Sequence, residues 1–325
     1  MSEDIDINDN DNDNDRVQSA PSSSVALLAA EPSPVAASET NQAADSPQTA
    51  SASYRLAYTD VDFLRREDLR PARLQLELLK AELLQQEQGV ESTVVIFGST
   101  RVLEPKLARE QARAATAAAA ADPDNHELTR QAAIAKRIAD KSRYYEEARR
   151  LAAMITRVSQ ENGHRHYVVV TGGGPGLMEA ANRGASDVGG KSIGLSIILA
   201  HEERPNPYIT PELCFQFQYF AIRKMHFLLR ARALVAFPGG FGTLDELFET
   251  LTLIQTRKVK PVPVVLFGRA YWNRVIDLDA MVEEGTIDPK DRDLIQFAER
   301  AEDAWAIIRA YYAEADDRDA IATDG

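Results

Sequence analysis

A short apolar run followed by a cluster of glycines, within residues 233–249, constrains the fold of this chain most strongly. Residues 234–237 are apolar and are followed by proline, as expected of a parallel strand that is covered on both faces. The glycines that follow break the strand and allow close approach of the backbone. Thr243 and Glu246 then have capping-box spacing, which predicts that Thr243 caps a helix. A glycine turn that leads into a helix N-terminus is a natural anion site.

Further apolar segments alternate with helical stretches along the chain. Besides 233–237, strands are predicted at 93–97, 166–170, 192–198 and 262–267. Helices are predicted between them and throughout the part after 267. This alternation predicts an α/β fold, a doubly wound and mostly parallel Rossmann-like sheet with helices on both faces.

The sequence divides into three regions. Residues 1–52 contain ten acidic residues and one arginine and are rich in Ala, Ser and Pro, so we expect a disordered tail. Residues 53–91 should form a helical arm, with Pro71 in the first turn of a leucine-rich helix. Residues 92–325 form the predicted nucleotide-binding domain, with a helical insertion at about 103–143. The net charge of −13 lies mainly in the tail, and no basic domain points to nucleic acid.

Other classes of protein receive little support from the sequence. No apolar run is long enough to span a membrane, and we expect no membrane partner. The single cysteine, Cys214, excludes an intramolecular disulfide and fits a reducing, cytoplasmic location. Its apolar neighbours predict a small core residue rather than a nucleophile. The five histidines have no metal-ligand spacing, so no metal site is expected.

Three loops of small residues follow predicted strands, and in a parallel sheet such loops gather at one edge, where ligands bind. They are Gly98-Ser99, 172–176 and 238–243. The spacing does not match the dinucleotide fingerprint, because its third glycine would fall on Leu177 or Asp245. It does not match a P-loop ending at Gly190-Lys-Ser either, because the first glycine of that motif would fall on Ala185. The remaining candidate ligand for these loops is a smaller phosphate compound, held by backbone N–H groups. The simpler alternative is that these glycines only form tight turns.

Four segments together resemble the LOG (Lonely Guy) family. Pro238-Gly-Gly-Phe-Gly-Thr-Leu-Asp-Glu246 matches the family motif Pro-Gly-Gly-x-Gly-Thr-x-x-Glu. Thr171-Gly-Gly-Gly-Pro-Gly-Leu-Met-Glu179 resembles its second glycine loop, Phe97-Gly-Ser99 its first, and Arg223-Lys-Met its Arg-Lys-Met segment. The resemblance covers roughly residues 93–270.

The resemblance implies a function and a set of site residues. Members of the family are cytokinin riboside 5′-monophosphate phosphoribohydrolases or broader nucleoside 5′-monophosphate nucleosidases, and they are usually dimers. They release the free base and ribose 5-phosphate, and no cofactor is expected. Glu246 and Arg223 match the catalytic pair. The implied substrate-binding residues are Gly98, Ser99, Gly172, Gly173, Gly174, Gly176, Met178, Lys224, Gly239, Gly240, Gly242 and Thr243.

Some alternatives remain open at this stage. Glu246 could serve only to cap a helix, and Arg223 and Lys224 could be exposed charges on a helix. A nucleotide carrier or a molybdenum-cofactor carrier could share the fold without catalysis. Many family members carry the label "lysine decarboxylase", which would require pyridoxal phosphate on a lysine such as Lys224. We also expect a homodimer or a higher homo-oligomer, since the arm offers a leucine-rich face.

Overall fold

The computed structural model describes residues 46–160, 165–198 and 204–323. The chain divides into two units, residues 1–64 and 65–325. Within the described part of the first unit there are short helical turns, and most side chains are exposed. These turns are α1 (Pro47–Ala50), a 3₁₀ turn (Ala52–Tyr54) and α2 (Val61–Leu64). The predicted disordered tail lies almost entirely outside the described residues.

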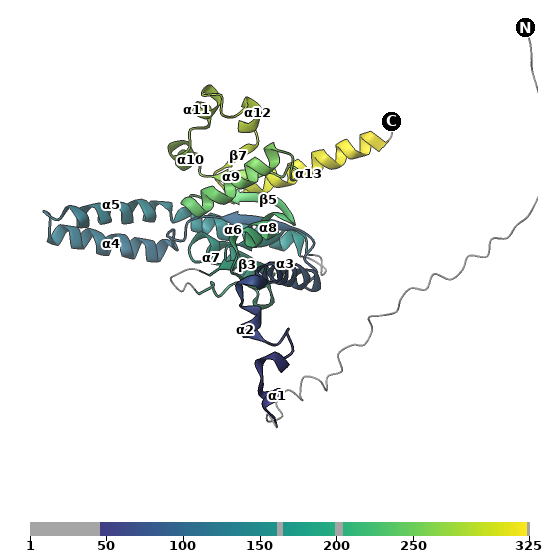
Figure 1. Cartoon of the computed structure of the whole chain (residues 1–325). Coiled ribbons are helices and arrows are strands. Elements are labelled where there is room, and N and C mark those ends of the chain that lie inside the picture. The colour runs from purple at the N-terminus through teal and green to yellow at the C-terminus, as the bar shows by residue number, and fades with distance from the viewer. Residues whose placement is uncertain (1–45, 161–164, 199–203, 324–325) are drawn as a thin grey trace, which may run out of the picture. The chain divides into compact units, whose positions relative to one another are not determined.

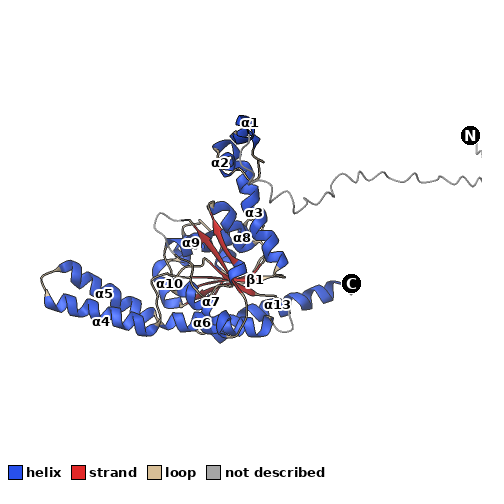
Figure 2. Ribbon diagram, turned by 90° about the horizontal axis from the view of Figure 1, so that it is seen from below, coloured by secondary structure: helices blue, strands red, loops and turns tan. Residues whose placement is uncertain are grey.

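The second unit is built on a seven-stranded sheet whose neighbouring strands are all parallel (Figures 1 and 2). Its strands are β1 (Thr93–Phe97), β2 (Val168–Thr171), β3 (Ser192–Ile197), β4 (Cys214–Phe217), β5 (Ala231–Ala236), β6 (Val264–Phe267) and β7 (Ile295–Ala298). Their order is β4-β3-β2-β1-β5-β6-β7. The chain therefore builds outward from β1 in one direction and then restarts at β5 in the other, which confirms the predicted doubly wound topology.

Helices cover both faces of this sheet. They are α3 (Arg70–Glu87), α4 (Pro105–Ala121), α5 (His126–Lys141), α6 (Arg143–Ser159), α7 (Leu177–Asp187), α8 (Phe220–Leu228), α9 (Phe241–Gln255), α10 (Arg269–Val275), α11 (Leu278–Glu283), α12 (Pro289–Arg292) and α13 (Ala301–Thr323). Two further 3₁₀ turns are Glu67–Leu69 and Pro211–Leu213. In the described part of the chain, no helix combines the length and the apolar character needed to cross a membrane.

Alternate residues of the central strand point to opposite faces of the sheet, as the period of a β-strand requires. Val94 and Ile96 belong to a core completed by α6, α7 and α13. Val95 and Phe97 belong to a second core completed by α3, α8 and α9. Because β1 is buried on both faces, its sequence is a continuous apolar run rather than an alternating one.

Two strands were not predicted from the sequence, and both lie at edges of the sheet. Cys214–Phe217 forms β4, and Ile295–Ala298 forms β7 within a region predicted to be wholly helical. Along β4 the side chains alternate between exposed and buried, so Cys214 faces outward while Phe215 and Phe217 enter the core. The prediction of a buried Cys214 is therefore wrong, because β4 lies at the edge and one of its faces is open.

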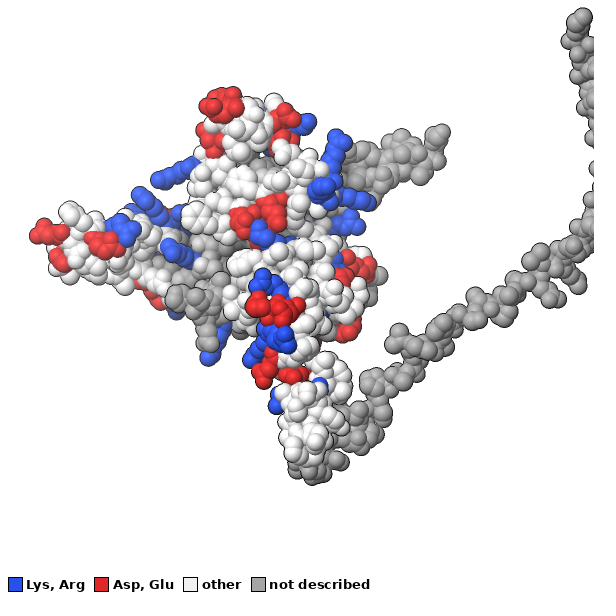
Figure 3. Space-filling view, in the orientation of Figure 1, with Lys and Arg blue, Asp and Glu red and all other residues white. Residues whose placement is uncertain are grey.

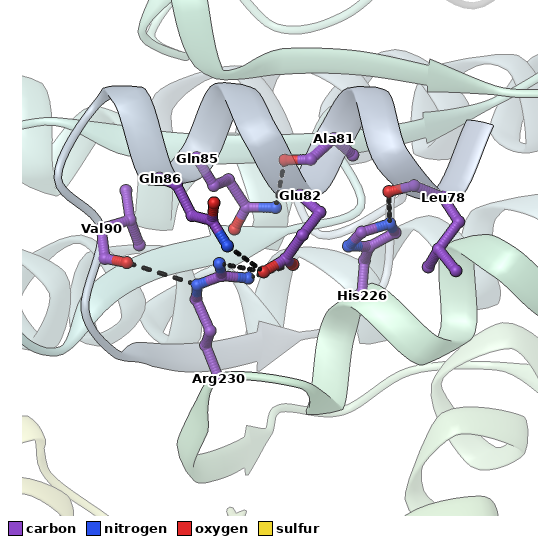
Figure 4. Close-up of polar contacts among 8 residues, drawn as sticks. All are labelled: Leu78, Ala81, Glu82, Gln85, Gln86, Val90, His226 and Arg230. Atoms are coloured by element: carbon purple, nitrogen blue, oxygen red, sulfur yellow. Dashed lines mark hydrogen bonds and ion pairs between the residues drawn. The ribbon is translucent and has the colours of Figure 1, made fainter. Parts of the chain in front are cut away.

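Helix α3 packs against α8 and the start of β5, and polar contacts fix it there (Figure 4). The guanidinium of Arg230 donates to both carboxylate oxygens of Glu82 at 2.6 Å and to the carbonyl of Val90 at 3.3 Å. One turn earlier, a ring nitrogen of His226 lies 3.2 Å from the carbonyl of Leu78. The leucine-rich helix of the predicted arm is thus part of the domain, held by a bidentate ion pair.

Helices α4 and α5 form an antiparallel hairpin between β1 and α6, and it extends away from the sheet (Figures 1 and 2). Alanine-rich α4 ends at Ala121, directly before the Asp-Pro sequence that interrupts the helical pattern. On the face displayed in Figure 3, acidic and basic side chains are interspersed rather than segregated into a basic patch.

Helix α3 presents a row of exposed leucines on its outer side. Leu76, Leu79 and Leu83 are 55%, 49% and 50% exposed and follow helical spacing. Light scattering at micromolar concentration should give at least twice the chain mass of 35.9 kDa, since covering this row removes apolar surface from water. Leu79→Glu should shift the mass toward the monomer. A monomeric mass for the unmodified protein would contradict this prediction.

Candidate active site

The loops after β1, β2 and β5 meet at the edge formed by the carboxyl ends of these strands. The order of the strands along the chain reverses there, between β1 and β5. Together the loops line a cavity of about 600 Å³. This is the position at which doubly wound sheets bind their ligands. Most of the candidate residues from the sequence line it, namely Gly98, Ser99, Gly172, Gly173, Gly174, Met178, Arg223, Gly240, Gly242, Thr243 and Glu246.

Three candidate residues are not among the residues that line this cavity. Gly176 has φ +71° and packs against the carbonyl of Ser99, so it shapes the junction of two loops. The carbonyl of Gly239 accepts a hydrogen bond from the hydroxyl of Tyr271 at 2.6 Å. Lys224 lies beside the cavity, and its side chain is held by two carboxylates. The first two therefore support the loops, and Lys224 acts at most through its charge.

The cavity also contains residues that the sequence did not single out. They include Arg101, Ser196, Arg204, Phe220 and Phe241. Ser196 lies near the end of β3, so its position beside the loop after β2 follows from the parallel order of the sheet. The other four lie in loops or at helix ends, where no periodic sequence pattern predicts which way a side chain points.

Glu246 is 7% exposed and lies on α9 at the wall of the cavity. Burial raises the pKa of its carboxyl group to about 7, the positive charge of Lys224 lowers it, and the negative charge of Glu249 raises it. The group therefore exchanges its proton near neutral pH, which is the range in which general acid–base catalysis is most effective.

The prediction that Thr243 caps this helix is wrong. Helix α9 begins at Phe241 and its N-cap residue is Gly240, without a side-chain hydrogen bond to the first turn. The backbone N–H of Thr243 already donates to the carbonyl of Gly240 at 3.0 Å. The glycines begin the helix earlier than the capping-box spacing indicates, so Glu246 lies inside α9 and is not part of a capping box. The uncapped first turn leaves backbone N–H groups at the cavity.

Arg223 reaches the cavity from α8. Its Nε donates to the carbonyl of Leu195 at 2.7 Å, and its guanidinium lies 5.1 Å from the ring centre of Phe227. A Cβ atom at position 172 would lie 2.7 Å from Nη2, so glycine there lets the guanidinium approach the loop. Burial lowers the pKa of Arg223 and the charge of Glu246 opposes this, but a guanidinium stays protonated in proteins.

Lys224, the next residue of α8, is ion-paired with α9. Its Nζ lies 2.9 Å from Asp245 and 3.0 Å from Glu249. Burial lowers the pKa of Lys224, but hydrogen bonds to the two carboxylates outweigh this effect and raise it. The amine is therefore kept as a cation, whereas Schiff-base formation with pyridoxal phosphate requires a neutral amine. These surroundings do not fit a decarboxylase lysine.

Comparison with known proteins links the site to one family. Residues 178–308 match the family model described as "Possible lysine decarboxylase". A probable cytokinin riboside 5′-monophosphate phosphoribohydrolase from Oryza sativa subsp. japonica is 30% identical over 162 residues, which are 47% of this chain and 63% of that protein. A cytokinin riboside 5′-monophosphate phosphoribohydrolase from Arabidopsis thaliana is 33% identical over 153 residues, 45% of this chain and 69% of that protein.

Among solved structures, a molybdenum cofactor carrier protein from Chlamydomonas reinhardtii is 22% identical, with a TM-score of 0.38. The similarity covers 53% of this chain and 89% of that one. A likeness this distant says nothing about function. The match to the Arabidopsis enzyme is closer and extends over more than two thirds of its length, and the glycine loops, Arg223 and Glu246 lie together around one cavity. The chain therefore belongs to the LOG family.

Proposed function

We propose that this protein hydrolyses the N-glycosidic bond of a nucleoside 5′-monophosphate, such as AMP or a cytokinin riboside monophosphate. The products would be the free base and ribose 5-phosphate. The observation that carries the proposal is a buried carboxylate with a pKa of about 7, Glu246, in one cavity with an arginine and three glycine loops. Its family membership supports the same reaction.

The reaction requires a negative charge near the ribose. As the bond from C1′ to the base nitrogen breaks, positive charge develops on the ribose, as in glycoside hydrolysis. Ionised Glu246 can stabilise that charge, or it can take a proton from the water that attacks C1′. The oxygen of water then bonds to C1′, and the base leaves with the bonding electrons and gains a proton. Asp245 also lines the cavity but is ion-paired with Lys224, so the proton for the base would come from water or from protonated Glu246.

The remaining groups suit the phosphate and the ribose. The Nη atoms of Arg223 have no hydrogen-bond partner among the described residues, and they form a planar fork that suits hydroxyl or phosphate oxygens. The first turn of α9 and the glycine loops supply backbone N–H groups, which bind phosphate together with the helix dipole. A non-catalytic carrier would need these groups too, but it would not need a buried carboxylate with a pKa near 7.

Removal of the 5′-phosphate tests this proposal. A nucleoside leaves the phosphate-binding N–H groups without partners, which costs about 1–3 kcal/mol for each group. We therefore expect kcat/KM for AMP to exceed that for adenosine by at least ~100-fold, the effect of two such groups. The measurement is the initial rate of adenine release from each substrate. Equal rates for the two substrates would contradict the proposal.

The pH dependence of the reaction should report the charges around Glu246. If the ionised carboxylate is the active form, kcat/KM rises with pH and its acid limb has a midpoint near 7. Lys224→Met removes a positive charge that lowers this pKa, so the midpoint should move to higher pH. Glu249→Gln removes a negative charge that raises it, so the midpoint should move to lower pH. Shifts in the same direction for both variants would contradict the assignment.

A further inference from the structure

A buried asparagine from the segment between β3 and β4 contacts the second glycine loop from behind. The side-chain amide of Asn206 donates to the carbonyl of Gly173 at 3.2 Å and to that of Gly174 at 3.1 Å. The backbone N–H of Asn206 donates to the same carbonyl of Gly173 at 2.9 Å. Asn206 is 7% exposed and does not line the cavity, so it touches the loop but not the ligand space.

These contacts determine the direction of the backbone N–H of Gly174, the next donor in the loop. In a trans peptide the C=O and N–H groups point in opposite directions. The carbonyl of Gly173 shares a peptide with the N–H of Gly174, so holding that carbonyl at Asn206 turns this N–H away from Asn206. The N–H of Gly173 is already used, since it donates to Oγ1 of Thr171 at 3.0 Å. Residue 175 is proline and has no N–H.

Among residues 173–175, Gly174 therefore carries the only N–H without an acceptor, and Gly174 lines the cavity. Among the described residues, no acceptor is hydrogen-bonded to it. Gly173 has φ +78°, a conformation that L-residues rarely adopt, so this turn of the loop favours glycine. A donor that is fixed in place before the ligand arrives costs little reorganisation on binding.

Asn206 is itself held in one orientation. Its Oδ1 accepts from the backbone N–H of Tyr208 at 3.2 Å, and its Nδ2 also donates to Oδ1 of Asn182 at 2.9 Å. Nδ2 of Asn182 donates in turn to Oγ of Ser192 at 3.0 Å. Because both asparagine side chains are buried and hydrogen-bonded, the amide of Asn206 cannot rotate without leaving buried groups unpaired.

We propose that Asn206 is a positioning residue that aims the N–H of Gly174 at the 5′-phosphate of the substrate. This inference rests on the proposed function, because it requires a phosphate in the cavity. It assigns Asn206 an effect on phosphate affinity and no contact with the reacting atoms. Loss of Asn206 should then weaken ligands that carry the phosphate and leave those without it unaffected.

The test compares ribose 5-phosphate and ribose as inhibitors of the full-length protein. Asn206→Ala and Asn206→Asp both remove the side-chain hydrogen bonds to the carbonyls of Gly173 and Gly174, and only the backbone N–H of residue 206 still holds the carbonyl of Gly173. For each, the inhibition constant of ribose 5-phosphate and the KM for AMP should rise roughly tenfold, the effect of one hydrogen bond to a charged group. The inhibition constant of ribose should stay unchanged. Ser192→Ala is the matched control, since it alters the same network without touching the loop, and it should leave all three constants unchanged.

The outcomes separate this inference from the proposed function. If ribose 5-phosphate binds the unmodified protein no better than ribose, both proposals fail. If the unmodified protein prefers ribose 5-phosphate and both Asn206 variants keep that preference, only the role of Asn206 is overturned. A parallel loss of affinity for ribose, or failure of both variants to fold while Ser192→Ala folds, would give Asn206 a general structural role and overturn the inference. Circular dichroism during thermal melting monitors folding.

Discussion

Replacing Glu246 with glutamine should lower the turnover of AMP by at least ~100-fold, the low end of general acid–base effects, and leave the protein folded. A neutral amide has nearly the same shape, but it can neither stabilise positive charge on the ribose nor accept a proton from water. Since Glu246 does not cap α9, its loss removes no helix-capping bond. Single-turnover rates with saturating AMP measure the effect without interference from weaker binding.

The stability of the same variant separates a catalytic role from a structural one. The pKa of Glu246 is about 7 in the folded state, against the ordinary value of 4.5 for an exposed glutamate carboxyl. The folded state therefore binds more protons between these values, and stability falls as the pH rises through this window. At pH 8, Glu246→Gln should melt at the same temperature as the unmodified protein or above it. Near-normal turnover in this variant would contradict the catalytic assignment.

Glu249→Gln provides the matched control for Glu246→Gln. Glu249 lies on the same helix three residues later and pairs with Lys224, and it does not line the cavity. This variant should keep most of its turnover and shift only the pH profile. A loss as large as that of Glu246→Gln would mean that the charge of the whole cluster, rather than one carboxylate, supports the reaction.

Arg223→Ala should lower kcat/KM for AMP roughly 100-fold, the scale observed when one donor to a transition state is removed. The fork supplied by the two Nη atoms is lost, and Glu246 loses a neighbouring positive charge that lowers its pKa. Arg223→Lys should recover little of this activity, because an ammonium group lacks the planar fork. Initial rates at several AMP concentrations give the effects on KM and kcat separately.

Arg183→Lys is the corresponding control. Arg183 lies on α7 outside the cavity, and its Nη1 forms an ion pair with Glu104 at 3.3 Å. The substitution should leave kcat/KM for AMP unchanged. Full activity in Arg223→Lys would instead show that only a positive charge is needed at that position.

The central strands could be predicted because burial on both faces leaves a clear sequence pattern. β1 is a continuous apolar run, and β5 ends at a proline and a glycine cluster. The edge strands were missed because their signal is weaker. In β4 the alternation of Phe215 and Phe217 with outward residues spans only four positions, and β7 is equally short. A period of two over four residues is difficult to distinguish from a loop or a helix end.

The placement of the motif residues around the cavity could be predicted where it depends on the backbone, and less well where it depends on the direction of a side chain. Parallel topology alone brings the three glycine loops to one edge. The sequence did not reveal that Lys224 turns toward α9 while its neighbour Arg223 enters the cavity. Asn206 was missed because its contact with Gly173 spans 33 positions along the chain. The raised pKa of Glu246 likewise depends on burial, which no short motif encodes.

The most direct test of the account is to identify the products that the purified protein forms from AMP. Chromatography quantifies adenine, and phosphorus NMR distinguishes ribose 5-phosphate from AMP and inorganic phosphate. We predict equal amounts of adenine and ribose 5-phosphate, both absent with Glu246→Gln over the same time. Intact AMP after prolonged incubation, under conditions in which a panel of other nucleoside 5′-monophosphates also stays intact, would contradict the account. Release of inorganic phosphate with adenosine would contradict it as well.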